Sequence, residues 1–153
     1  MNFRRILSFA ILVCVGCTAP TRTDSEKSYI DDKKLFVSYF SLNVSAHLST
    51  YSELSVVEAV QHLERFQDIE NAWIVDENNK LIAVLKSGGF SIGELLNESW
   101  LHPEIARAKD AKAIMVIIRR DENRMIYTFI SPLFDRVFKR YIGAAIIQYG
   151  RRR

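Results

Sequence analysis

Cysteine is almost absent from this 153-residue chain, and both of its cysteines, Cys14 and Cys17, lie within the first 20 residues. A disulfide framework and a cysteine-rich zinc site are therefore excluded from the rest of the chain. Proline and glycine are also scarce, with 3 and 6 residues, which excludes collagen-like and low-complexity architectures. No apolar run approaches the roughly 20 residues that a membrane-spanning helix needs, so a multi-span membrane protein is excluded as well.

Hydrophobic residues make up 48% of the chain and charged residues 25%, with a formal net charge of +3. This balance is typical of one globular domain, and about 140 residues suffice to bury a core. Catalytic patterns are missing, because His47, His62 and His102 are scattered without ligand spacing and no nucleophile-elbow motif occurs. We therefore expect no enzyme activity, no metal site and no cofactor.

The first 17 residues have the features of an export signal. Two arginines precede a short apolar run that is too short to span a bilayer. Gly16 directly precedes Cys17, and this arrangement resembles the bacterial lipobox, although Cys14 stands where the lipobox usually has leucine. The resemblance implies removal of residues 1–16 and acylation of Cys17, as with palmitate. A plain signal peptide, an uncleaved anchor and a redox-active cysteine pair are the alternatives.

Residues 17–32 are rich in Thr, Ser, Asp and Lys and are predicted to form a flexible tether, with the globular domain over residues 33–153. The residue after Cys17 is Thr18 and not aspartate. In this respect the sequence resembles lipoproteins that are sorted to the outer membrane. We therefore expect a lipid-anchored protein of the bacterial cell envelope that faces the periplasm, with the outer membrane favoured.

Charge is distributed unevenly along the mature chain. Residues 17–106 carry 7 basic and 14 acidic side chains, whereas residues 107–153 carry 12 basic and 4 acidic ones. Such a basic half can bind nucleic acid or anionic lipid. Because an exported protein meets little nucleic acid, we expect a solvated face, or contact with lipid headgroups or a partner, and no nucleic-acid binding.

Two segments at the start of the domain, residues 35–49 and 53–66, are candidate helices. Residues 35–49 carry two incompatible patterns, since polar and apolar residues alternate over 40–49, as in a strand, while apolar residues also recur at helical spacing. Residues 53–66 are predicted to form a helix, because Ser55 and Glu58 have capping-box spacing and an apolar stripe follows.

Five short apolar runs separated by turn residues predict β-strands. The first two flank a turn at 77–79 and form a hairpin that Gly88 and Gly89 end. A variable connection follows, with a helical turn near 92–96 and a break before Pro103. Short turns require antiparallel neighbours, so the sequence predicts the α+β class, with a five-stranded antiparallel sheet and helices on one face. The strand candidates are 72–76, 80–85, 113–118, 125–130 and 141–149.

Six short segments share the order of helix, hairpin and final strands of a known family. They are NVSAHL (43–48), EAVQHL (58–63), DIENAWIVD (68–76), NKLIA (79–83), ISPL (130–133) and YIGA (141–144). Together they resemble the PAS-like extracytoplasmic sensor domains of the CHASE and Cache type, as found in periplasmic sensors of diguanylate cyclases. The resemblance implies a PAS-like sheet with a long N-terminal helix, which favours the helical pattern over 35–49, and a second helix packed on the same face.

The resemblance implies a sensor that binds a small ligand or a protein partner. Members of this family usually lie between two transmembrane helices, and this sequence has no second apolar span. We therefore expect the signal to pass to a separate membrane signalling protein, such as a kinase or a cyclic-dinucleotide enzyme. The alternative is a passive structural or assembly lipoprotein that offers an interaction surface. The apolar residues of 35–48 also permit a homodimer through the N-terminal helix.

In PAS-like domains the variable connection covers one sheet face, and the ligand pocket lies between the two. The resemblance therefore implies that ligand-binding side chains come from this connection and from the sheet. The candidates are Trp73, Lys86, Trp100, His102, Tyr127 and Ser131. For Trp73, Trp100 and Tyr127 the alternative is that they fill the core. Asp135 and Lys139, near the final turn, are expected to be solvated.

Overall fold

The computed structural model describes residues 22–86, 91–121 and 123–152. The predicted signal segment, the lipid-acceptor residue Cys17 and the glycines Gly88 and Gly89 lie outside the described residues. The elements are the helices α1 (Arg22–Ser49), α2 (Glu53–Gln61) and α3 (Leu101–Ala111), the 3-10 helix η1 (His62–Arg65), and the strands β1 (Ile69–Asp76), β2 (Leu81–Val84), β3 (Met115–Asp121), β4 (Arg124–Phe134) and β5 (Tyr141–Arg152).

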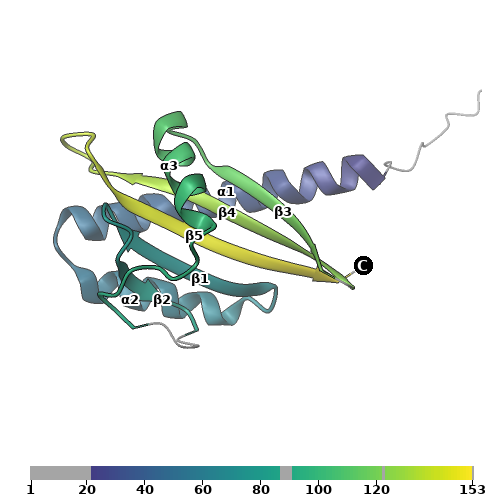
Figure 1. The fold of residues 1–153 in the computed structure, drawn as a ribbon, viewed down its shortest axis with the longest axis horizontal. Coiled ribbons are helices and arrows are strands. Elements are labelled where there is room, and N and C mark those ends of the chain that lie inside the picture. Colours follow the sequence, from purple (N-terminus) through teal and green to yellow (C-terminus); the bar gives the residue numbers. More distant parts are fainter. Residues whose placement is uncertain (1–21, 87–90, 122, 153) are drawn as a thin grey trace, which may run out of the picture.

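The five strands form one antiparallel sheet in the order β2-β1-β5-β4-β3. The last strand lies at the centre, because both β1 and β4 pair with it, with Ile146 opposite Trp73 on one side and Ile130 on the other. Strands far apart in sequence therefore become neighbours, as Figure 1 shows for β1 and β5. The predicted α+β class and its five-stranded antiparallel sheet are confirmed.

Helices α1 and α2 cover one face of this sheet, as predicted. Val37 and Val44 lie two turns apart on one side of α1, and they join Val56 and Val60 from α2 in a single buried cluster. The sheet contributes Ile74, Phe129 and Ile147 to the same cluster. The strand-like alternation over 40–49 is not realised, because these residues belong to α1 and the helix directs Val44 into the cluster on the sheet.

The predicted tether is wrong from residue 22 onward, because α1 already begins at Arg22. In this first part of the helix, Glu26 accepts a hydrogen bond from the hydroxyl of Tyr127 at 3.2 Å. The ring of Tyr29 packs against the ring of Tyr127, with 5.0 Å between centroids, and Lys33 forms an ion pair with Asp68. Composition alone predicted a solvated linker, whereas these contacts bind the helix to the sheet.

Helix α2 and the following η1 confirm the predicted helix over 53–66. The predicted capping box is wrong, because the helix begins at Glu53 and Ser55 lies inside it. The residue at the N-cap is Ser52, and its hydroxyl lies 2.7 Å from the hydroxyl of Ser55 instead of contacting a backbone N–H. The hydroxyls of Ser52 and Ser55 therefore form a hydrogen bond with each other instead of capping the helix.

The opposite face of the sheet is covered by α3, a helix that the sequence did not predict (Figure 1). The predicted break before Pro103 is wrong, because Pro103 is the third residue of this helix. A proline is tolerated in a first turn, where backbone N–H groups have no acceptor within the helix. The predicted helical turn near 92–96 is a non-helical turn, with Leu95 bridged to Lys80. The residues that α3 buries are Leu101, Ile105 and Ala108, which pack on Trp73, Ile130 and Ile146.

No helix in the described part of the chain combines the length and the apolar character needed to cross a membrane.

Candidate functional site

The six candidate ligand-binding residues are divided between the two faces of the sheet. Alternation along β4 directs Tyr127 and Ser131 toward α1, where Tyr127 joins the α1–α2 cluster. Trp73 on β1 points to the other face, beneath α3, and Lys86 is exposed beyond the end of β2. The structure therefore does not assemble these residues into one site.

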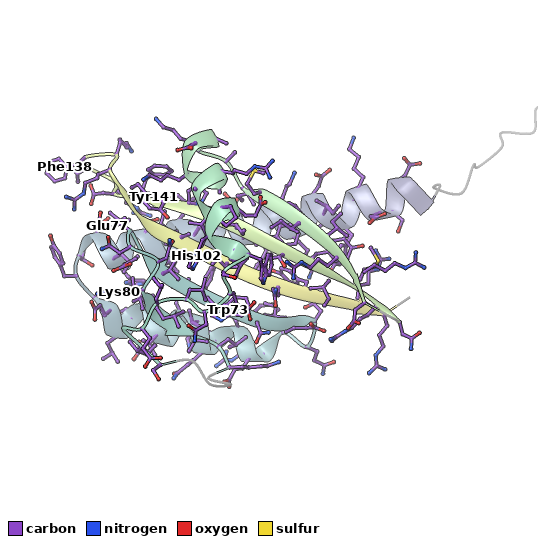
Figure 2. All side chains as sticks on the ribbon, viewed as in Figure 1. Trp73, Glu77, Lys80, His102, Phe138 and Tyr141 are labelled. Atoms are coloured by element: carbon purple, nitrogen blue, oxygen red, sulfur yellow. The ribbon has the colours of Figure 1, made fainter. Side chains whose placement is uncertain are left out.

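On the α3 face, ring nitrogens of His102 and Trp100 already have partners within the protein. Trp73 is 2% exposed and belongs to the apolar cluster under α3. Nε2 of His102 lies 2.8 Å from the carbonyl oxygen of Leu96, and Nε1 of Trp100 donates to Glu98 at 2.6 Å. Figure 2 shows Trp73 and His102 near the sheet and the connection.

The ring of Trp100 is covered by a cation rather than left open to a ligand. Cζ of Arg119, on β3, lies 3.4 Å from the centroid of this ring. A guanidinium stacked on an indole face is a favourable contact, worth about 0.5–1 kcal/mol when exposed. The connection and the sheet are thus joined by packing and by this stacked pair.

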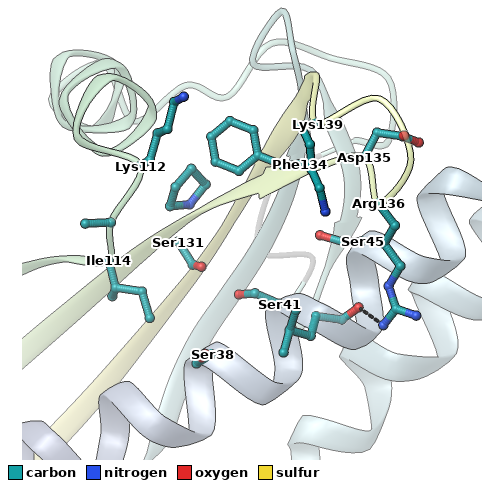
Figure 3. Close-up of a pocket in the computed structure, with 13 residues that line it drawn as sticks. Ser38, Ser41, Ser45, Lys112, Ile114, Ser131, Phe134, Asp135, Arg136 and Lys139 are labelled. Carbon is teal, nitrogen blue, oxygen red and sulfur yellow. Dashed lines mark hydrogen bonds between the residues drawn. The ribbon is translucent and has the colours of Figure 1, made fainter.

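A cavity of about 310 Å³ lies elsewhere, between α1 and the end of β4. Its position follows from the sheet register, because the pairing of β3 with β4 starts at Met115 opposite Ile130. The last residues of β4, from Ser131 to Phe134, pair with β5 only. Pro132 lies in this part, as expected for a strand edge where one ladder is missing. Helix α1 passes beside this edge (Figure 3).

Serine hydroxyls line this cavity. Ser38, Ser41 and Ser45 lie three and four residues apart on α1, so they share one helix face, and Ser131 contributes from β4. Ser41, Ser45 and Ser131 are buried. Figure 3 shows the hydroxyls of Ser41 and Ser131 turned toward each other across the cavity.

Oγ of Ser41 has no hydrogen-bond partner among the described residues, although the side chain is only 5% exposed. Leaving a buried hydroxyl unpaired costs roughly 1–3 kcal/mol. The hydroxyl borders the cavity, so a polar group placed there would remove this cost.

Charged residues stand at the rim of the cavity, on the loop between β4 and β5. Nη2 of Arg136 donates to the carbonyl oxygen of Leu42 at 3.3 Å, which ties the loop to α1. Figure 3 shows the ammonium of Lys139 directed toward Ser45, whereas the ammonium of Lys112 points away.

The loop itself is fixed by Asp135. Its Oδ1 accepts the backbone N–H groups of Phe138 at 2.7 Å and of Val137 at 2.8 Å. These hydrogen bonds, with that from Phe138 the strongest cause, lower the pKa of Asp135 below its usual value. The backbone N–H of Lys139 donates to the carbonyl oxygen of Asp135 at 3.1 Å, so the loop holds Lys139 beside the cavity.

Ser131 is among the residues predicted from the sequence, but the three serines of α1 that line the same cavity are not. The available signal was the helical spacing of Ser38, Ser41 and Ser45, which the strand-like alternation over 40–49 obscured. Lys139 is exposed, as expected, but it also lines the cavity, and Asp135 is bound to its own loop rather than simply solvated.

Among the residues that the structure describes, no group of three His, Cys, Asp or Glu side chains is placed to hold a metal ion.

No family model matches this chain, and no curated protein matches its sequence. Solved structures are similar to it. The ligand-binding domain of the Campylobacter jejuni chemoreceptor Tlp3 with L-valine has 11% identity and a TM-score of 0.62, over 82% of this chain and 54% of that one. The ligand-binding domain of Mlp24 with asparagine has 12% identity and a TM-score of 0.61, over 85% and 52%.

The sensor domain of the V. cholerae histidine kinase DctB has 9% identity and a TM-score of 0.56, over 83% of this chain and 51% of that one. This chain therefore spans about half the length of these structures. At such low identity the likeness shows the fold. The predicted PAS-like fold of extracytoplasmic sensor domains is confirmed.

Proposed function

We propose that this protein is a sensor of the bacterial cell envelope that binds a small ligand and reports its binding to a separate membrane signalling protein. The observation that carries the proposal is a cavity of about 310 Å³, lined by buried hydroxyls, within a PAS-like fold. Pockets for small molecules usually begin at roughly 300 Å³. Tlp3 and Mlp24, which share the fold, have been solved with amino acids bound, which supports a ligand of similar size.

The position of the cavity suggests how binding would be reported. Ser41 and Ser45 belong to α1, and this helix begins five residues after Cys17, the proposed lipid acceptor. A ligand held between α1 and β4 contacts the helix nearest the proposed membrane anchor. Its binding can therefore change the free-energy difference between two arrangements of α1. To act as a signal, the ligand must bind one arrangement of α1 more tightly than another. The proposed partner is a membrane-bound kinase or cyclic-dinucleotide enzyme that reads this difference.

A thermal-shift screen of small metabolites on the full-length chain tests the proposal. A compound at 100 times its Kd adds about 2.7 kcal/mol to the free energy of unfolding. We expect at least one compound to raise the Tm, and we expect the shift to vanish in Ser41→Leu, which fills the cavity. Asn43→Leu is the matched control, because it places the same side chain on an exposed position of α1. A shift that survives Ser41→Leu would contradict the site, and the absence of any shift would contradict the ligand.

The proposed lipid anchor and partner have their own test. Cys17→Ser should move the protein from the membrane fraction to the soluble periplasmic fraction, and the acylated protein should co-purify with a membrane kinase or cyclase. Repeated purification from envelope extracts without any such protein would contradict the signalling role.

A passive interaction module is the second candidate function, and one observation favours it. Leu35, Tyr39 and Leu42 share one side of α1 and are 59%, 67% and 53% exposed. Contiguous exposed apolar side chains often mark an interaction surface. Self-association or partner binding that depends on these three residues, without any small ligand, would favour this alternative.

A further inference from the structure

We propose that the cavity between α1 and β4 binds a small carboxylate with a short aliphatic chain. This inference rests on the proposed ligand-binding function and names the chemical class of the ligand. It is carried by three properties of the cavity, namely convergent hydroxyl donors, an excess of positive charge at the rim and apolar walls.

The hydroxyl donors come from two elements that face each other. Ser41 and Ser45 on α1 and Ser131 on β4 are all at least nine-tenths buried, and Oγ of Ser41 has no partner among the described residues. A carboxylate has two oxygens that accept about four hydrogen bonds in total. Hydroxyls placed on both sides of a cavity can therefore donate to one carboxylate at the same time.

The charge at the rim favours an anion. Two cations of the β4–β5 loop, Arg136 and Lys139, and one carboxylate, Asp135, line the cavity, whereas the ammonium of Lys112 points away from it. The negative charge of Asp135 is partly offset, because its Oδ1 accepts two backbone N–H groups of its own loop. The ammonium of Lys139 is directed toward Ser45, so it is placed to contact an anion bound in the cavity (Figure 3).

The walls set the size and the apolar part of the ligand. Leu42, Ala113, Ile114, Pro132 and Phe134 line the cavity around the serines. A volume of about 310 Å³ is at the lower end for small-molecule sites, so a short chain fits better than a bulky one. An aliphatic chain gains free energy by leaving water at these walls, roughly 0.8 kcal/mol for each buried CH₂, which a small inorganic anion cannot gain.

Calorimetric titration of the full-length chain carrying Cys17→Ser tests the inference with three probes: butyrate, its neutral counterpart butyramide and inorganic phosphate. We expect butyrate to bind at least tenfold more tightly than either of the others. In Lys139→Gln the affinity for butyrate should fall about tenfold, since a charge-assisted hydrogen bond is lost. Ser41→Leu should abolish binding. Arg140→Gln is the matched control and should leave the affinity unchanged, because Arg140 is a cation of the same loop that does not line this cavity.

Three outcomes would overturn the inference. One is butyramide or phosphate binding as tightly as butyrate. Another is butyrate binding with the same affinity in Lys139→Gln and Ser41→Leu as in the parent chain. The third is no binding of butyrate at all. None of these outcomes contradicts the proposed function by itself, which fails only if the broad thermal-shift screen also finds no ligand.

Discussion

The hydroxyl of Tyr127 on β4 donates a hydrogen bond of 3.2 Å to the carboxylate of Glu26 on α1, which lies 101 positions earlier in the chain. This contact places the first turns of α1 on the sheet. At 1.5 Å per residue, the 28 residues of α1 extend about 42 Å. One continuous helix therefore connects the region next to the proposed anchor at Cys17 with the serines of the cavity.

The docking of the first part of α1 is testable through Lys33 and Asp68. Their ion pair joins α1 to the loop before β1, and both side chains are partly buried. We expect Asp68→Asn to lower the free energy of unfolding by about 1 kcal/mol, because Lys33 loses its partner. A double-mutant cycle with Lys33→Met, measured by urea denaturation, should give a coupling free energy of similar size. Asp31→Asn, at an exposed position of α1, is the control, and a coupling energy of zero would show that the Lys33–Asp68 ion pair does not stabilise the docked helix.

Gly143 on β5 is predicted to be irreplaceable. Its φ is 147°, and a Cβ at this position would lie 2.0 Å from the backbone oxygen of Val75. Gly143→Ala must therefore displace β1 or β5, and we expect it to cost about 3 kcal/mol or more of unfolding free energy.

Gly93→Ala is the matched control for Gly143→Ala. Gly93 also has a positive φ, 85°, but a Cβ there would meet nothing within 4 Å. We expect a loss of about 1 kcal/mol from backbone strain alone. Equal Tm values for the two variants would contradict the close approach of β5 to Val75.

Alkaline pH should destabilise the fold through its buried tyrosines. Burial raises the pKa of both Tyr29 and Tyr141 from 10.0 to about 12, and it also raises the pKa of Tyr149. Because the folded state favours the neutral phenols, their contribution to stability is intact below pH 10 and is lost as the pH rises toward about 12. Tyrosinate absorbance and circular dichroism should therefore change together above pH 10. Ionisation of all six tyrosines near pH 10 with the fold intact would contradict this prediction.

The docking of α3 on the second sheet face is tested by Ile105. This side chain is 3% exposed and packs in the cluster that contains Trp73 and Ile130. We expect Ile105→Ala to cost about 2–5 kcal/mol, the usual range for truncating a buried isoleucine. Arg107→Ala, two residues further on an exposed side of α3, should change stability little. Similar unfolding midpoints in urea for both variants would show that α3 does not pack on the sheet.

The elements with strong local patterns were predictable from the sequence. The hairpin around residues 77–79 is an example, because Asp76 accepts the backbone N–H groups of Asn78 and Lys80 at 2.8 Å and stabilises the turn locally. Helix α1 was ambiguous from periodicity alone, since its serines alternate with apolar residues. The family resemblance resolved it toward a helix, but not its true start at Arg22.

The parts that were missed depend on contacts between distant residues. Nothing near Glu26 or Tyr29 in the sequence indicates that Tyr127 will bind both of them. The cavity was missed for the same reason, because it exists only where β3 stops short of the end of β4 and α1 passes beside the unpaired edge. Ser131 is a candidate from the sequence, but Ser41 and Ser45, which line the same cavity, lie about 90 positions earlier in the chain.

A small ligand that binds between α1 and β4 should perturb residues of both elements. Amide chemical-shift mapping of the full-length chain, titrated with the most stabilising compound of the screen, tests this binding most directly. We expect the largest shift changes at Ser41, Ser45 and Ser131, with small changes at Trp100 and His102 on the other face. The largest changes at Trp100 and His102, or no changes around the three serines, would contradict it.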